Sequence, residues 1–99
     1  MANRMKTLKN DWVEGSVQDF LNLSDAEMEL IETRRALARQ VRVLRRERGL
    51  TQTALATRLK TSQSRVAKME AADATVSIDL LVQTLFRLGM KRRELAKAI

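Results

Sequence analysis

The sequence predicts an all-α fold, and three observations lead to that prediction. Proline is absent and Gly occurs only three times in 99 residues. The residues that cost least in a helix, Ala, Leu, Arg, Lys, Glu and Gln, are abundant. Apolar residues recur three, four and seven positions apart, mostly behind a capping residue. With 44% hydrophobic residues the chain can bury one small core, so we expect five or six helices around it.

The N-terminal third differs from the rest of the chain. Residues 1–15 show no sustained periodicity, which is typical of an arm. Ser16 then predicts the N-cap of a short helix at 17–21. We therefore divide the chain into an arm with an acidic helical extension, residues 1–33, and a helical domain, residues 34–99.

A long helix is predicted to run from the acidic extension into the helical domain. Ser24 and Glu27 match the S-x-x-E capping box, in which each side chain accepts the other residue's backbone N–H. Gly49 can end the helix in the left-handed conformation. A rod of about two dozen residues is roughly 35 Å long and should extend beyond a small core, so its acidic first half is a candidate interface. The apolar stripe consists of Leu30, Ile31, Leu37, Ala38, Val41 and Leu44.

Four shorter helices follow, three of them behind a hydroxyl side chain that can cap a helix. Their inward positions are set by the helical period. The expected elements are 52–59 after Thr51, 63–71 after Ser62, 78–88 after Ser77, and 90–99. The expected inward residues are Leu55, Ala56, Leu59, Val66, Met69, Ile78, Leu81, Leu85 and Leu88.

Charge is divided along the chain. The segment from Asn10 to Thr33 holds seven acids and no Lys or Arg, a net charge of −7. The segment from Arg34 to Lys68 holds eleven basic residues and one acid, a net charge of +10. A basic segment of this density favours a polyanionic partner such as nucleic acid, and the acidic segment favours a basic partner or an intramolecular mask. Two solvated helix faces are the alternative.

Several function classes are excluded by the residues that are missing. The chain has no Cys, His or Tyr, so thiolate nucleophiles, imidazole bases and Cys/His zinc sites are not available. We expect no catalytic site, metal or cofactor. No apolar run reaches the length of a membrane span, and the N-terminus lacks a signal-peptide pattern, so we expect a cytoplasmic protein.

Two of the short helices form a motif. They are joined by a three- to four-residue turn, and the second is polar on its outer face. T-Q-x-x-L-A (51–56) and S-Q-S-x-V-x-x-x-E (62–70) resemble the phage repressor/Cro-type helix-turn-helix family, also called the XRE family. The resemblance covers about residues 34–90. It implies a lambda-repressor-like fold and a sequence-specific DNA-binding transcriptional regulator, commonly a repressor.

The resemblance also implies a role for each matching position. The first helix of the motif crosses the phosphate backbone, and the second lies in the major groove. Gln63 would pair with an adenine, and Gln52 would brace Gln63 and reach a phosphate. Arg45 and Glu70 would form a structural ion pair. The implied base contacts are Gln63, Ser64, Arg65 and Lys68, and the implied phosphate contacts are Thr51, Gln52, Arg58, Thr61 and Ser62.

Two positions depart from the family pattern. Lys60 stands where the family commonly has Gly, so a left-handed conformation there would cost roughly 1 kcal/mol. Ala72 stands where Gly often ends the second helix, which leaves the path of residues 72–75 open.

The sequence also indicates partners. GSVQDFLNLSDAE (15–27) and VSIDLLVQTLFRLG (76–89) resemble HigA-type antitoxins, which implies a basic toxin bound through the acidic segment 10–33. A homodimer on double-stranded DNA is expected, and its surface lies either at 25–31 or, as we favour, at 78–99. Trp12 is interpreted as a packing anchor or a partner contact.

Two other functions stay open. A protein-interaction adaptor could use the same fold without reading bases. RNA binding is possible, but the chain has only three aromatic residues to stack on bases, one Trp and two Phe.

Overall fold

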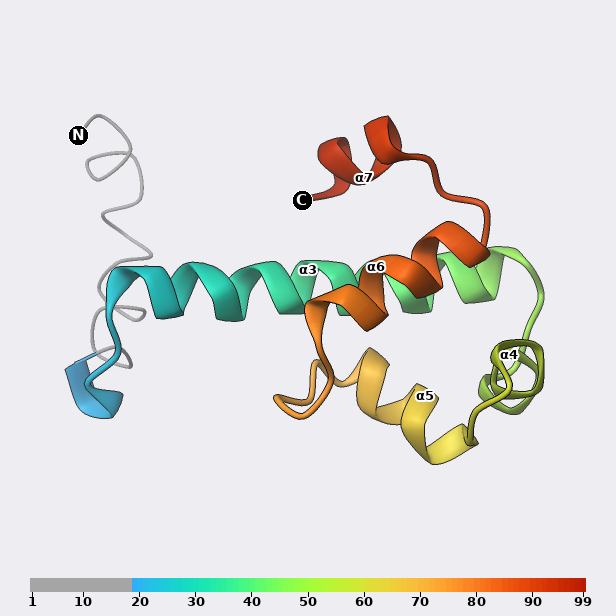
Figure 1. Ribbon diagram of the computed structural model, residues 1–99, viewed down its shortest axis with the longest axis horizontal. Helices are drawn as coiled ribbons and strands as arrows, with labels where there is room; N and C mark the ends of the chain where they lie inside the picture. The colour runs from blue at the N-terminus through green and yellow to red at the C-terminus, as the bar shows by residue number, and fades with distance from the viewer. Residues whose placement is uncertain (1–18) are drawn as a thin grey trace. The chain divides into compact units, whose positions relative to one another are not determined.

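The computed structural model of the protein describes residues 19–99, in which all regular secondary structure is helical. A helical segment at 19–21 comes first. The helices that follow are α3 (Asp25–Glu47), α4 (Gln52–Leu59), α5 (Gln63–Glu70), α6 (Ile78–Arg87) and α7 (Arg92–Ala98) (Figure 1). The all-α prediction is confirmed. The predictions for the arm, for Ser16 and for Trp12 lie outside the described residues.

The chain divides into two compact units, the first ending at Ile31 and the second comprising Glu32–Ile99. The described part of the first unit contains the predicted capping box. The Glu27 backbone N–H donates to Ser24 Oγ at 3.1 Å, and the Ser24 backbone N–H donates to Glu27 Oε1 at 3.3 Å. This reciprocal pair fixes the start of α3.

The three hydroxyl caps predicted for the second unit are present. Thr51 Oγ1 accepts the N–H of Ala54 at 3.0 Å, and Ser62 Oγ accepts the N–H of Arg65 at 3.1 Å. Ser77 Oγ accepts the N–H of Leu80 at 3.1 Å. Each cap satisfies one backbone donor that has no partner within its helix, so α4, α5 and α6 begin where the sequence predicts.

One hydrophobic core lies within the second unit and draws on α3, α4, α5 and α6. Its buried residues are Leu37, Val41, Leu44, Leu55, Ala56, Val66, Met69, Val76, Leu81, Leu85 and Leu88. Leu59 and Ile78, expected to point inward, are only partly buried at its edge. Two polar residues, Arg45 and Thr84, are buried as well, and the Thr84 hydroxyl donates to the carbonyl of Leu80 at 2.8 Å. No buried polar side-chain atom of the described residues lacks a partner.

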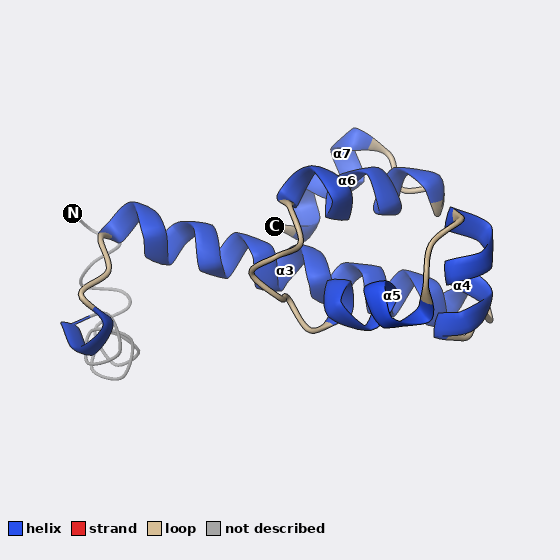
Figure 2. Ribbon diagram, turned by 60° about the horizontal axis from the view of Figure 1, so that its bottom comes forward, coloured by secondary structure: helices blue, strands red, loops and turns tan. Residues whose placement is uncertain are grey.

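Helix α6 lies along the second half of α3 and runs in the same direction. Near one end, Arg34 Nε donates to the carbonyl of Val76 at 3.3 Å, and near the other, Arg48 Nε donates to the carbonyl of Leu88 at 3.1 Å. Figure 2 shows α4 at one end of the α3–α6 pair, with α5 packed beside α4. The arrangement leaves the outer face of α5 uncovered.

Four helices end in the same turn. In each, the first residue after the last turn has a positive φ, and two backbone N–H groups bond back to carbonyls three and five residues earlier. Gly49 and Gly89 occupy this position after α3 and α6. Lys60 (φ 57°) and Ala72 (φ 56°) occupy it after α4 and α5. The strained conformation foreseen for Lys60 is therefore present, and Ala72 shares it.

Four predicted helix boundaries are wrong by one or two residues, and one of them is the end of the last helix, which lies at Ala98 rather than Ile99. Helix α5 ends at Glu70 because Ala71 (ψ 1°) has already left the helix for the terminal turn. Helix α6 ends at Arg87 rather than Leu88 for the same reason. The last helix begins at Arg92, not Met90, because the Met90 N–H bonds to the carbonyl of Leu85 in the turn after α6.

The left-handed residue after α5 gives a stability prediction. Ala72→Gly should raise the free energy of unfolding by about 1 kcal/mol, because Gly adopts a positive φ without the steric cost of a Cβ. The matched control is Ala71→Gly at φ −86°, which should lower it by about 0.5–1 kcal/mol. Urea denaturation of both variants provides the measurement. Equal destabilisation by the two changes would contradict the explanation.

Candidate nucleic-acid interface

The turn between α4 and α5 sets the position of the candidate reading helix. Only Lys60, Thr61 and Ser62 separate the two helices. Lys60 is left-handed (φ 57°, ψ 47°), and the Thr61 N–H bonds to the carbonyl of Ala56 at 2.9 Å, which closes α4. Ser62 then caps α5 at once. This short connection fixes the direction of α5 relative to α4.

The sides of α5 follow from a rotation of about 100° per residue. Val66 and Met69 are buried and define the inner side. Ser64 and Lys68 lie opposite them and are exposed. Gln63 and Glu70 share one flank of the helix, and Arg65 lies on the other, beside α6. The implied base contacts therefore occupy the outer face and both flanks of one short helix.

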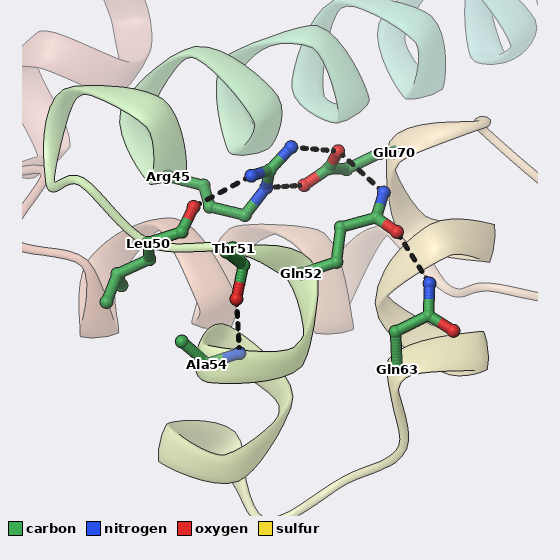
Figure 3. Close-up of polar contacts among 7 residues, drawn as sticks. All are labelled: Arg45, Leu50, Thr51, Gln52, Ala54, Gln63 and Glu70. Atoms are coloured by element: carbon green, nitrogen blue, oxygen red, sulfur yellow. Dashed lines mark hydrogen bonds and ion pairs between the residues drawn. The ribbon is translucent and has the colours of Figure 1, made fainter.

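A nearly buried ion pair lies on the first flank. The Arg45 guanidinium donates from Nε to Glu70 Oε2, and from Nη2 to Glu70 Oε1 at 3.0 Å (Figure 3). Arg45 Nη1 also donates to the carbonyl of Leu50 at 2.8 Å. The two side chains are only 10% and 5% exposed. A bidentate ion pair fixes the orientation of the two side chains as well as their distance. Together with the bond to Leu50, it joins α3, the loop before α4, and α5.

Two glutamines extend this ion pair toward the surface. Gln52 Nε2 donates to Glu70 Oε1 at 3.1 Å, and Gln63 Nε2 donates to Gln52 Oε1 at 2.7 Å. Figure 3 shows the four side chains in a single row from Arg45 to Gln63. We call this row, Arg45–Glu70–Gln52–Gln63, the polar chain. Gln63 keeps its Oε1 and one Nε2 hydrogen for a ligand, the pattern that suits an adenine edge.

The charge of Glu70 is maintained by its partners. Burial by itself would raise the pKa of Glu70, but hydrogen bonds from Arg45 and Gln52, with the nearby positive charges of Arg45 and Arg42, more than compensate. The pKa of Glu70 therefore lies below its ordinary value. The hydrogen bond to Glu70 likewise raises the pKa of Arg45, so both groups are ionised at neutral pH.

The residues implied as phosphate contacts lie around the two helix N-termini and the turn. Thr51 and Ser62 use a hydroxyl lone pair for their caps, so each can still donate its own hydrogen to a phosphate oxygen. Arg58 is exposed at the end of α4, whereas Thr61 is half-buried in the turn. Gln52 has one Nε2 hydrogen left after its bond to Glu70.

Three arginines that sequence reasoning did not assign lie at the edges of this surface. Arg42 and Arg46 line a shallow hollow with Gln52 and Ala67. Their spacing of four residues on the exposed side of α3 was a signal that could have indicated them. Arg87, from α6, lines a hollow with Arg58, Leu59 and Lys60, and nothing local in the sequence places it there.

The described residues hold no cluster of three or more His, Cys, Asp or Glu side chains that could bind a metal ion. None of the described helices is both long and apolar enough to cross a membrane.

The ion pair gives a second stability prediction. Arg45→Ala should lower the free energy of unfolding by about 3 kcal/mol, because it leaves the carboxylate of Glu70 nearly buried without its charged partner. Arg46→Ala, one position along the same helix but exposed, is the control and should change it by no more than about 0.5 kcal/mol. Urea denaturation measures both. If the two variants were equally stable, the pair would have no structural role.

The lowered pKa of Glu70 gives a prediction for acid. A carboxylate with a lowered folded-state pKa stabilises the fold above its unfolded pKa of about 4.3, and that contribution is lost as pH falls toward the folded value. The stability advantage of the wild type over Glu70→Gln should therefore be constant near neutral pH and shrink below about pH 4.3. Thermal unfolding of both proteins from pH 7 to 3 tests this. An advantage that stays constant down to pH 3 would contradict it.

Comparison with known proteins agrees with this geometry. The helix-turn-helix domain family matches the chain over residues 36–98. No curated protein and no solved structure shows significant similarity to it. The family match covers well over half of the chain and includes both short helices and the turn between them, so the chain belongs to the helix-turn-helix domain family of DNA-binding regulators.

Proposed function

We propose that the protein is a sequence-specific transcriptional regulator of the phage repressor/Cro type, which represses by occupying its operator. The observation that carries this proposal is the exposure of the polar side chains of α5 and the fixed orientation of one of them. Ser64 and Lys68 on its outer face and Gln63 on its flank are exposed, and Gln52 holds Gln63 so that one acceptor and one donor of its amide stay unused. A helix that served only to cover the core would not need an oriented amide at its exposed end.

Charge around α5 supports the same proposal. Arg58, Lys60 and Arg87 lie on one side of the two short helices, and Arg42 and Arg46 lie on the other. Positive side chains on both sides of a reading helix can hold the two phosphate strands that border a major groove. In this proposal these five basic side chains, Lys60 included, join Thr51, Gln52, Thr61 and Ser62 as phosphate contacts. We assign the protein no catalytic activity.

A homodimer is part of the proposal, because two copies would read a pseudo-palindrome with half-sites ~34 Å apart. The C-terminal side of the domain has apolar surface for this purpose. Phe86 of α6 is 40% exposed and the terminal Ile99 is 59% exposed. Burial of both in a symmetric contact would remove apolar area from water.

The acidic segment favours a second role as an antitoxin, which would neutralise a basic toxin and repress its own operon. In the described part of this segment, Phe20 is 87% exposed and Leu30 is 47% exposed. The described acids of the segment are Asp19, Asp25, Glu27, Glu29 and Glu32. Large apolar groups among acids suit a partner that is both basic and apolar. Co-expression with a small basic protein encoded beside this gene tests the role, and failure of the two to co-purify would argue against it.

The DNA-binding function is tested by affinity for duplexes from the gene's own upstream region against random duplexes, at about 150 mM salt and over a salt series. A preference of at least ~10³ supports a regulator that reads sequence. Equal binding to every duplex with a steep salt dependence would favour the alternative, an adaptor protein whose basic surface binds phosphates without selecting bases.

Gln63→Ala gives the corresponding prediction for a single residue. Its affinity for the cognate duplex should fall by about 1–3 kcal/mol, with selectivity lost at one base pair, because a bidentate base contact is removed. Lys60→Ala is the contrasting control, since loss of a phosphate contact should weaken binding to all sequences alike. Fluorescence anisotropy with singly substituted duplexes measures both. A uniform loss for Gln63→Ala would refute its base-reading role.

A further inference from the structure

The ion pair of the polar chain has a chemical property beyond its contribution to stability. An ionised carboxylate can only accept hydrogen bonds. Glu70 Oε1 accepts from Arg45 Nη2 at 3.0 Å and from Gln52 Nε2 at 3.1 Å. Since the side chain of Glu70 is only 5% exposed, it is placed to act on its neighbours rather than to touch a ligand itself.

The acceptor character of Glu70 determines how the amide of Gln52 is turned. An amide has a donor side and an acceptor side, and only the NH₂ group can face a carboxylate favourably. Gln52 Nε2 therefore faces Glu70, and Gln52 Oε1 faces the opposite way. This orientation follows from the chemistry of the pair, even though the two ends of an amide have almost the same shape.

The orientation of Gln52 in turn fixes the orientation of Gln63. Gln52 Oε1 can only accept, so Gln63 must present its own NH₂ group, which it does at 2.7 Å. Gln63 is then left with one N–H donor and the Oε1 acceptor, which match the N7 acceptor and the N6 donor of adenine. If the row were reversed, Oε1 of Gln63 would face Gln52 and both N–H groups would be free. That arrangement suits the two acceptors of guanine.

We propose that Glu70 is a positioning residue for base recognition: its carboxylate fixes the amide of Gln52, and through it the amide of Gln63, in the orientation that selects adenine over guanine. This inference rests on the DNA-binding function proposed above and adds to it the residue that sets base preference. Arg45 has the supporting role of holding the carboxylate ionised and in place. The ion pair thus links stability of the domain to its specificity.

The test is a double-mutant cycle of Glu70→Gln, Gln52→Met and the two combined. The amide that Glu70→Gln introduces has a donor as well as an acceptor, so the row can reverse. Gln52→Met leaves the Arg45–Glu70 pair intact and cuts the link to Gln63. The readout is the ratio of affinities for the cognate duplex with adenine or guanine at the base pair where Gln63→Ala loses its selectivity.

Wild type should prefer adenine there by roughly 5- to 150-fold, the range of a good bidentate contact. Each single variant should reduce that ratio by at least about fivefold, and the combined variant should reduce it no further, because both changes interrupt the same row. Leu37→Ala, at a buried core position about two turns of α3 before Arg45, is the control for destabilisation and should keep the wild-type ratio. All ratios are measured well below the melting temperature of each variant.

Each other result overturns the inference. If Gln52→Met keeps the wild-type ratio, the row does not orient Gln63, and this holds even if Glu70→Gln does not fold. If the combined variant loses more than either single one, Glu70 acts by another route. Should the wild type itself bind all duplexes equally, the proposed function fails and the inference with it. A wild type that selects its own DNA beside variants with unchanged ratios refutes the inference alone.

Discussion

Arg45 makes the contact on which most of the polar architecture depends. Its guanidinium donates to Glu70 at the end of α5 and to the carbonyl of Leu50 ahead of α4. These partners lie 25 and five residues away in the sequence. A planar group with donors in fixed directions can hold three segments at once, which a Lys at the same position could not do. The pair is costly to bury, and it is tolerated because each guanidinium nitrogen and each carboxylate oxygen has a hydrogen-bond partner.

The helix ends show a second constraint, which is the shortness of the connections. Lys60 and Ala72 adopt a conformation that favours Gly, because each must reverse the chain directly after a helix of eight residues. The steric cost of a positive φ at a non-Gly residue therefore occurs at the two turns that flank α5. Around α3 and α6, Gly49 and Gly89 provide the same turn without that cost. At Gly89 a Cβ would also lie 3.2 Å from the guanidinium of Arg48, which bonds to the adjacent Leu88 carbonyl.

Helix α5 is attached to the domain by a few residues on its inner side and one flank, and its outer face is exposed. Val66 and Met69 anchor the helix in the core and Glu70 joins it to the ion pair, so its exposed positions Ser64, Arg65 and Lys68 can differ without loss of the fold. One flank connects to the ion pair through Gln63 and Glu70, and the other lies near Arg87 of α6. A reading helix that is anchored by few residues but oriented by many hydrogen bonds can combine specificity with a small core.

The sequence by itself determined the starts of the four helices that have a hydroxyl cap and most of their inward positions, because these depend on contacts within four residues. Ser24, Thr51, Ser62 and Ser77 cap as predicted for that reason. The ends of α5 and α6 and the start of the uncapped last helix were less accurate, since the terminal turns include residues such as Ala71 and Met90 that continue the apolar pattern. The contact between Gln52 and Gln63 was expected from the family resemblance, but only the tertiary structure showed that Gln52 also meets Glu70, 18 residues away, which sets the orientation of both amides. The tertiary structure also decided which basic side chains lie beside α4 and α5, namely Arg42, Arg46 and Arg87. Packing of separate helices, not sequence spacing, brings such side chains together.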